Sequence, residues 1–148
     1  MIRVQDLDFD IGAEIAALRA GRSDIGAIAV FAGIVRDHAS SSDVSAMTLE
    51  HYPGMTEREL ERIEKEAHAR WPLIASTIIH RVGRLLPGEN IVLVAVASAH
   101  REAAFAAAQF LMDYLKTEAP FWKREEMGEG ERWVEERAAD REAASRWE

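Results

Sequence analysis

Apolar residues recur at two different spacings along the chain, and these spacings separate predicted strands from predicted helices. Residues 25–35 form a β-branched, apolar run interrupted by two glycines, which predicts a buried strand. Two further apolar runs, 73–86 and 90–99, predict a pair of strands joined by a Pro-Gly-Glu turn. Weaker alternation at 2–9 and 44–52 predicts one more strand in each segment.

Helical spacing is found in two amphipathic segments before the middle of the chain. Residues 10–21 end on a glycine and predict a short helix. The segment 56–71 opens with Thr56 and Glu59, the pattern of a capping box, and its apolar positions lie three or four residues apart. The residues expected to be buried on this helix are Leu60, Ile63, Ala67 and Trp71.

Residues 100–119 are rich in alanine and predict a third helix, which Pro120 stops. Ser98 is the expected N-cap of this helix, because a serine hydroxyl can accept from the free N–H groups of the first turn. The predicted buried stripe consists of Phe105, Ala108, Met112 and Leu115.

The remaining segments are polar or charged. Residues 36–43 predict an exposed, mobile loop, and the chain from Arg124 onward predicts a Gly-Glu-Gly turn between a short strand and a terminal helix. No linker interrupts the pattern, so we expect one domain over residues 1–148, with a charged tail at about 138–148. Strands and helices alternate without a strict βαβ rhythm, which predicts an α+β fold with mainly antiparallel strands.

The overall charge narrows the range of partners. The formal net charge is −8 and the pI is near 5.2, so nucleic acid and membrane surfaces are not expected as partners. The absence of cysteine excludes disulfides, thiolate metal ligands and a cysteine nucleophile. Neither a signal peptide nor a membrane-spanning apolar run is found, which indicates a soluble, cytoplasmic protein.

Two lysines flank the end of the third predicted helix and are the first candidates for chemistry. Lys116 lies in the last helical turn, where the helix dipole favours a cation, so a structural role alone would explain it. Lys123 follows Pro120 in a segment that must be extended. The aromatic residues between them, Phe121 and Trp122, are compatible with core packing or with the wall of a pocket.

Other cations stand where anions commonly bind. Arg36 follows a predicted strand, and His100 and Arg101 stand at a predicted helix start, although each is also compatible with an ordinary surface residue. The spacing of the five histidines matches no metal motif, so no metal site is expected. These residues and the two lysines support an anion pocket, and their spacing leaves open whether they converge.

Six motifs occur in series along most of the chain: FAGIVRDH (31–38), LEHYPGM (49–55), IIHRVGRLLPGE (78–89), SAHREAAF (98–105), MDYLKTEAPFWKRE (112–125) and RWVEER (132–137). In this order and spacing they resemble the large, catalytic subunit of molybdopterin synthase, the MoaE family. The resemblance runs from about residue 25 to residue 137. The loop RDHASSSDV departs from it, because the family usually has a glycine before the valine.

The resemblance implies an α/β-hammerhead-type fold with an additional, mainly antiparallel sheet. It also implies a sulfurtransferase that converts cyclic pyranopterin monophosphate, precursor Z, to molybdopterin, with no resident cofactor. Two sulfurs would come from the thiocarboxylated C-terminus of a small ubiquitin-like subunit that ends in Gly-Gly. The implied assembly is a homodimer of large subunits with one small subunit at each end, a heterotetramer.

The same resemblance assigns roles to residues. Lys116 matches the principal catalytic residue, and Lys123 matches a second essential lysine. His100 and Arg101 match an anion-binding pair that would come from the other subunit of the dimer. The full set of implied substrate contacts is Ile34, Val35, Arg36, His100, Arg101, Lys116, Lys123, Arg124, Glu125 and Arg137.

Two alternatives come from other functional classes. A non-catalytic scaffold could keep the fold and bind the small subunit or the pterin without turnover. A generic binder of nucleotide phosphates is the other, but the chain has no glycine-rich phosphate motif.

Overall fold

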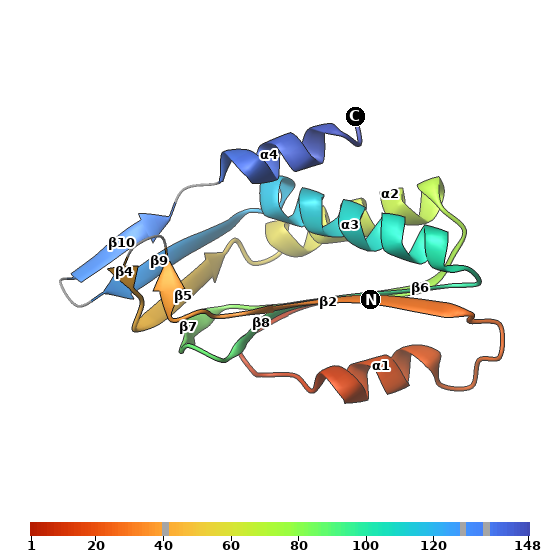
Figure 1. Ribbon diagram of the computed structural model, residues 1–148, viewed down its shortest axis with the longest axis horizontal. Coiled ribbons are helices and arrows are strands. Elements are labelled where there is room, and N and C mark those ends of the chain that lie inside the picture. The colour runs from red at the N-terminus through yellow and green to blue at the C-terminus, as the bar shows by residue number, and fades with distance from the viewer. Residues whose placement is uncertain (40–41, 128–129, 135–136) are drawn as a thin grey trace.

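The computed structural model of the chain describes residues 1–39, 42–127, 130–134 and 137–148. Within these residues the chain forms four helices and two four-stranded sheets, one mixed and one antiparallel (Figure 1). The predicted α+β class is therefore confirmed. No helix in the described part of the chain has both the length and the apolar composition needed to cross a lipid bilayer.

The mixed sheet forms the centre of the molecule, with the strand order β1-β6-β8-β2. Its strands are β1 (Ile2–Gln5), β6 (Leu73–Arg81), β8 (Asn90–Ser98) and β2 (Ala27–Ile34). β1 runs parallel to β6, and the other neighbours are antiparallel. β6 and β8 are buried along most of their length, as expected for central strands whose two faces are both covered.

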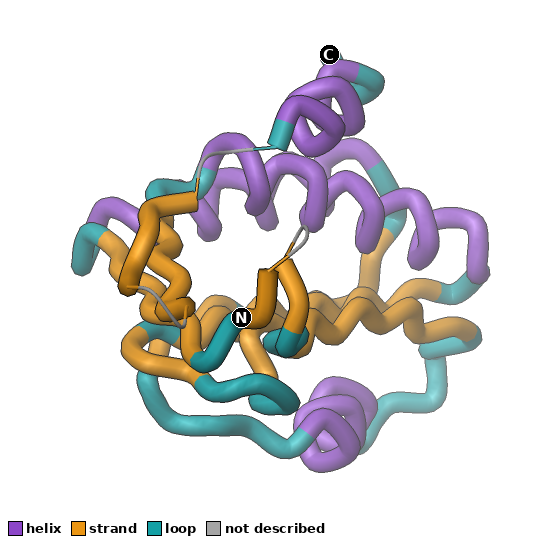
Figure 2. Tube along the Cα trace, turned by 60° about the vertical axis from the view of Figure 1, so that its left-hand side comes forward, coloured by secondary structure: helices purple, strands orange, loops and turns teal. Residues whose placement is uncertain are grey.

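Helices cover both faces of this sheet. α2 (Met55–Arg70) and α3 (Arg101–Glu118) lie on one face, and α1 (Ile11–Arg19) lies on the other (Figures 1 and 2). The short helix α4 (Ala138–Ser145) packs on the outer side of α3. The first three helices match the segments that the sequence predicts to within one or two residues at each end.

The second sheet is antiparallel and lies beyond one end of the mixed sheet (Figure 1). Its order is β10-β9-β5-β7, with β10 (Gly130–Val134), β9 (Phe121–Met127), β5 (Ala46–His51) and β7 (Gly83–Leu85). β9 directly follows α3, so this sheet lies next to the C-terminal end of that helix (Figure 1).

The main core lies between the mixed sheet and helices α2 and α3. The stripe predicted for α2 is confirmed at Leu60, Ile63 and Ala67, which are fully buried. Phe110 of α3 is also fully buried, and its ring makes edge-on contacts with Trp71, Tyr114 and Trp147. These aromatic contacts join α2, α3 and the C-terminal residues in one cluster.

The stripe predicted for α3 is wrong at Phe105, which is 67% exposed. Successive side chains of a helix point about 100° apart around its axis. A predicted stripe that is shifted by one residue from the buried face therefore includes a side chain that points to solvent. The buried apolar residues of α3 are Ala103, Ala104, Ala107, Ala108, Phe110, Leu111, Met112 and Leu115. Most of the residues on the buried face are alanines. Because alanine is only weakly hydrophobic, the buried face gives a weak pattern in the sequence.

The capping box predicted for α2 is also wrong. Gly54 is the N-cap, and its backbone N–H donates to the carboxylate of Glu57 at 3.1 Å. The buried hydroxyl of Thr56 accepts from the N–H of Tyr52 and donates to the carbonyl of Pro120, at 3.0 Å in each case. Thr56 therefore ties the start of α2 to the corner between α3 and β9.

Ser98 does not cap α3 as predicted. It ends β8, and its hydroxyl donates to the carbonyl of Pro72 at 2.9 Å. His100 is the N-cap residue of α3, without a hydrogen bond from its side chain to the helix. The short link Ala99–His100 leaves no room for an earlier helical turn.

Two strand predictions need correction. The run 73–86 divides between the two sheets, because Gly83 has a φ of 91°, which favours glycine and turns the chain. The run 25–35 is an edge strand rather than a buried one, with Val30, Phe31 and Ile34 each more than 40% exposed.

The predicted loop 36–43 instead contains the hairpin strands β3 (His38–Ala39) and β4 (Ser42–Asp43). Residues 40 and 41 of this segment, and residues 128 and 129 of the predicted Gly-Glu-Gly turn, lie outside the described residues.

Candidate active site

Two adjoining hollows, of about 270 and about 420 Å³, open where the end of α3 meets β9 and the edge of the mixed sheet. We name them together the lysine pocket. The residues that line both hollows are Met47, His80, Ile91, Leu115, Lys116, Lys123 and Arg137. Four cationic and two acidic side chains contribute to the combined lining, so the pocket is positive in a chain whose net charge is −8.

The helix end brings the two lysines into this pocket. α3 stops at Glu118, and β9 begins at Phe121 immediately after Pro120. A proline removes the backbone N–H that would continue the helix and favours an extended residue before it. The helix is therefore followed at once by an extended strand, and Lys116 on α3 and Lys123 on β9 line the same hollows.

The surroundings of Lys123 lower the pKa of its amine. Burial is the main cause that lowers the pKa of Lys123, and the positive charge of Lys116 lowers it further. The carboxylates of Glu125, 3.9 Å from the Lys123 ammonium, and of Asp140 act in the opposite direction. An amine in this position releases its proton more readily than one in water, and it also binds an incoming anion more strongly.

His80 forms part of the floor of the lysine pocket, and sequence reasoning did not select it. Its ring is buried and stacks on Phe121, with 3.8 Å between ring centres and 18° between ring planes. Burial lowers the pKa of His80 to about 4, and the charge of Lys116 contributes to this shift. The sequence shows that His80 and Arg81 alternate along a strand and so point to opposite sides of the sheet. It does not show which of the two side chains points into a pocket.

This shift predicts an acid-sensitive component of stability. Unfolded His80 binds a proton near pH 6.5 but folded His80 only near pH 4, so the free energy of unfolding falls as the pH drops through this window. The full effect is about 3 kcal/mol. Urea unfolding of wild type and His80→Gln at pH 7 and pH 4.5 measures it. The wild type should lose more stability than the variant, and equal losses would show that folded His80 is protonated.

Four more of the residues selected from the sequence line the pocket. Arg36, Ile34 and Glu125 belong to the larger hollow, and Arg137, the residue before α4, belongs to both. Glu125 is 5% exposed, whereas Arg36 and Arg137 are exposed at the rim. The two arginines and the two lysines together give the pocket its positive lining.

Two selected residues point elsewhere. Val35 is 2% exposed and packs with Met47, Leu49 and Leu85 below the pocket. Arg124 lies between Lys123 and Glu125 on β9, so its side chain emerges on the opposite face of the sheet, where the guanidinium lies 5.4 Å from the ring centre of Trp133.

His100 and Arg101 are not near the lysines of the same chain. They stand at the start of α3, and Lys116 stands in its last turn. At 1.5 Å per residue, Arg101 and Lys116 are about 22 Å apart along the helix. One copy of the chain therefore cannot bring both ends of α3 to a small ligand.

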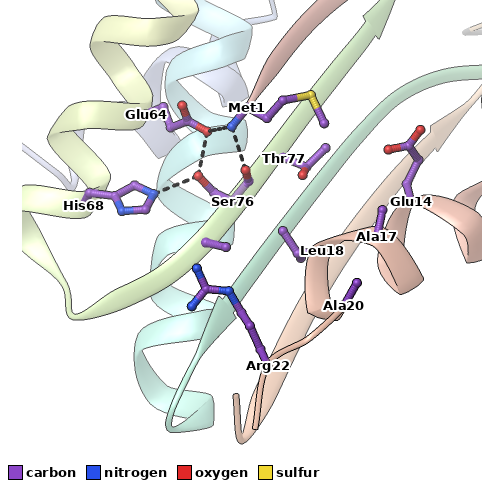
Figure 3. A pocket seen from close by; sticks show the side chains of 11 residues that line it. Met1, Glu14, Ala17, Leu18, Ala20, Arg22, Glu64, His68, Ser76 and Thr77 are labelled. Atoms are coloured by element: carbon purple, nitrogen blue, oxygen red, sulfur yellow. Dashed lines mark hydrogen bonds and ion pairs between the residues drawn. The ribbon is translucent and has the colours of Figure 1, made fainter. Parts of the chain in front are cut away.

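A second hollow of about 460 Å³ lies between α1, α2 and β6, away from the lysine pocket (Figure 3). Its polar groups bind one another: the amino group of Met1 and the hydroxyl of Ser76 both donate to Glu64, at 2.8 and 2.6 Å. His68 lies 2.8 Å from the same hydroxyl. These contacts join β6 to α2 and to the first residue, and they leave no concentrated charge for a ligand.

Among the described residues, no group of three or more His, Asp or Glu side chains is arranged to hold a metal ion. The ionisable groups that line the lysine pocket are two amines, two guanidinium groups, two carboxyl groups and a neutral imidazole. Such a set binds an anion, stabilises negative charge that develops on it, and transfers protons or forms a covalent bond through an amine.

Comparison with known proteins gives one consistent family. Residues 4–118 match the family model described as MoaE protein. The molybdopterin synthase catalytic subunit of Ralstonia nicotianae is 62% identical over 146 residues, which cover 99% of this chain and 83% of that protein.

Solved structures agree with this result. The molybdopterin biosynthesis MoaE protein from Burkholderia ambifaria has a TM-score of 0.85 at 58% identity, with 99% of this chain and 97% of that chain covered. The molybdopterin synthase structure from Staphylococcus aureus has a TM-score of 0.83 at 28% identity, covering 90% and 96%. A complex of subunits 1 and 2 of molybdopterin-converting factor from Helicobacter pylori, 20% identical with a TM-score of 0.76, shares the fold and covers 92% and 91%.

Proposed function

The chain belongs to the MoaE family, and we propose that its lysine pocket is where the reaction of that family takes place. Its function is that of the molybdopterin synthase catalytic subunit, a sulfurtransferase that converts precursor Z to molybdopterin with a small subunit. The observation that carries the site assignment is the convergence of Lys116 and Lys123 on one positive pocket in an acidic chain.

Lys116 acts as the acid–base or covalent group, and Lys123 acts electrostatically. Lys116 ends a helix on a long, exposed side chain, so its amine can reach a bound substrate. Lys123 is held deeper, beside Glu125, where its charge stabilises the phosphate of the precursor and the negative charge that develops as sulfur adds. Arg36 and Arg137 at the rim attract the anionic substrate into the pocket.

The sulfur donor is a thiocarboxylate on the C-terminal glycine of the small subunit. The chain has no cysteine, so it cannot itself carry the sulfur as a thiol or persulfide. A Gly-Gly tail is thin enough to enter a narrow hollow, and its thiocarboxylate is an anion suited to the positive lining.

Two copies of the chain form a dimer, with one small subunit at each end. His100 and Arg101 can serve the lysine pocket only from a second copy, because α3 separates them from Lys116. The edge strand β2 exposes Val30, Phe31 and Ile34 beside the larger hollow, a surface that a second copy would cover.

Mixing two inactive variants tests this shared site. In a dimer of Lys116→Ala with Arg101→Ala, one of the two sites keeps both residues. Equal, random mixing is therefore expected to restore about a quarter of wild-type activity, because half of the dimers are mixed and each has one intact site. Each variant alone stays inactive. No recovery after dissociation and reassociation would place both residues in the same copy's site.

Reconstitution tests the function as a whole. The chain is incubated with thiocarboxylated small subunit and precursor Z, and the dithiolene product is measured. Product formation supports the enzyme. Binding of both components without product would support the alternative, a non-catalytic scaffold, and binding of neither would contradict the family function.

Three further expectations remain part of the proposal. The chain is one domain over residues 1–148, its architecture is of the α/β-hammerhead type, and it acts in the cytoplasm. The contacts of α4 with α3 support the first of these, because they join the charged C-terminal segment to the main core.

A further inference from the structure

His80 is held rigidly at the floor of the lysine pocket. It stands near the end of the central strand β6, is 5% exposed, and lines both hollows. Its ring stacks on Phe121, which belongs to the segment between the two lysines. The imidazole is thus fixed between the mixed sheet and the start of β9.

One hydrogen bond fixes the position of its proton. Nδ1 of His80 lies 2.8 Å from the carbonyl oxygen of Arg81. A carbonyl can only accept, so Nδ1 carries the hydrogen in the neutral ring, and Nε2 is left with a lone pair. Within the described part of the chain, Nε2 receives no hydrogen bond, and the side chain faces the hollows.

The surroundings of His80 indicate which group can donate a hydrogen bond to this lone pair. Burial lowers the pKa of His80 to about 4, so its ring is neutral at physiological pH, and the charge of Lys116, which lines the same two hollows, contributes to this shift. Lys116 is the exposed lysine with a long, flexible side chain, whereas Lys123 already has Glu125 within 3.9 Å. An ammonium group without a fixed acceptor has many orientations, and only some of them are productive.

We propose that His80 is a positioning residue whose Nε2 accepts a hydrogen bond from the ammonium group of Lys116 and so directs that amine at the bound pterin. A neutral acceptor orients the lysine without cancelling the positive charge that the anionic substrate needs, which a carboxylate in the same place would do. This inference rests on the proposed catalytic assignment of Lys116.

Two substitutions separate this role from simple packing. His80→Phe keeps a ring to stack on Phe121 and removes the acceptor. His80→Gln loses the ring but places an amide oxygen close to the position of Nε2. We expect kcat to fall about 10- to 100-fold in His80→Phe, the loss typical of one hydrogen bond to a charged group, with KM and small-subunit affinity nearly unchanged.

His80→Gln is expected to recover most of the lost kcat. Packing alone predicts the opposite order, with the phenylalanine variant the more active of the two. Full activity of His80→Phe, or a glutamine variant as impaired as the phenylalanine variant, would overturn the proposal.

Parallel measurements distinguish this inference from the site assignment. If Lys116→Ala keeps activity, the site assignment fails, whatever His80 does. If Lys116→Ala is inactive and His80→Phe is fully active, only the role of His80 fails.

Nitrogen NMR of histidine-labelled protein gives a readout independent of activity. A single neutral tautomer with hydrogen on Nδ1 is expected for His80 at neutral pH. Hydrogen on Nε2 would leave no lone pair for Lys116 and would refute the proposal directly.

Discussion

Replacing Lys116 with alanine is expected to abolish measurable dithiolene formation while leaving binding of the small subunit nearly intact. The substitution removes the amine that reaches from the end of α3 into the lysine pocket. Loss of a positioned acid–base group lowers the rate by about 10²- to 10⁴-fold. The fold should survive, because Lys116 is exposed and lies in the last turn of its helix.

The chain provides a matched control for this prediction. Lys65 is an exposed lysine of α2 that lies outside both hollows, so Lys65→Ala removes the same charge from the overall balance. It should keep wild-type activity and wild-type affinity for the small subunit. Substantial turnover by Lys116→Ala, or an equal loss in the two variants, would remove the assignment of Lys116 as the catalytic lysine.

Replacing Phe110 with alanine is expected to give the largest loss of stability among single substitutions in α3. Its side chain is fully buried, contacts the rings of Trp71, Tyr114 and Trp147, and lies 4.8 Å from the guanidinium carbon of Arg70. Truncation of a buried phenylalanine costs about 3–5 kcal/mol, through lost burial and the cavity left behind.

Phe105 on the same helix is the control. It is 67% exposed, so Phe105→Ala should change the free energy of unfolding by less than about 0.5 kcal/mol. Chemical denaturation of the two variants measures the difference. A large loss of stability in Phe105→Ala would show that Phe105 is buried, as the sequence predicts, and would contradict the observed packing of α3.

The predictability of the fold varied with the strength of the hydrophobic signal. The stripe of α2 is built from large residues at regular spacing, and Leu60 and Ile63 were correctly predicted as buried. The buried face of α3 is mostly alanine, whose small side chains give a weak pattern, so the large but exposed Phe105 was misplaced. Thr56 resembled a cap because its local spacing was right, but its hydroxyl bonds to Pro120, 64 residues away.

The site was predictable where local chain geometry determines it. Pro120 ends a helix and is followed by an extended strand, which is a local effect, and Lys116 and Lys123 on either side of it line the same pocket. The place of His80 depends on the contact of its ring with Phe121, which joins β6 and β9 of two different sheets only in the folded molecule. The alternation of β9 explains why Arg124 faces away while its two neighbours do not, but the sequence alone could not show which face holds the pocket.

The most direct test of the shared pocket is the titration of Lys123 by NMR of ¹³C-labelled lysine side chains. The chain has three lysines, so each signal can be assigned by a single substitution. In wild type, burial and the charge of Lys116 should hold the pKa of Lys123 below its ordinary value, and in Lys116→Ala that pKa should rise. An identical midpoint in the two proteins would mean that the two amines do not face one another, and the mechanism built on their convergence would be contradicted.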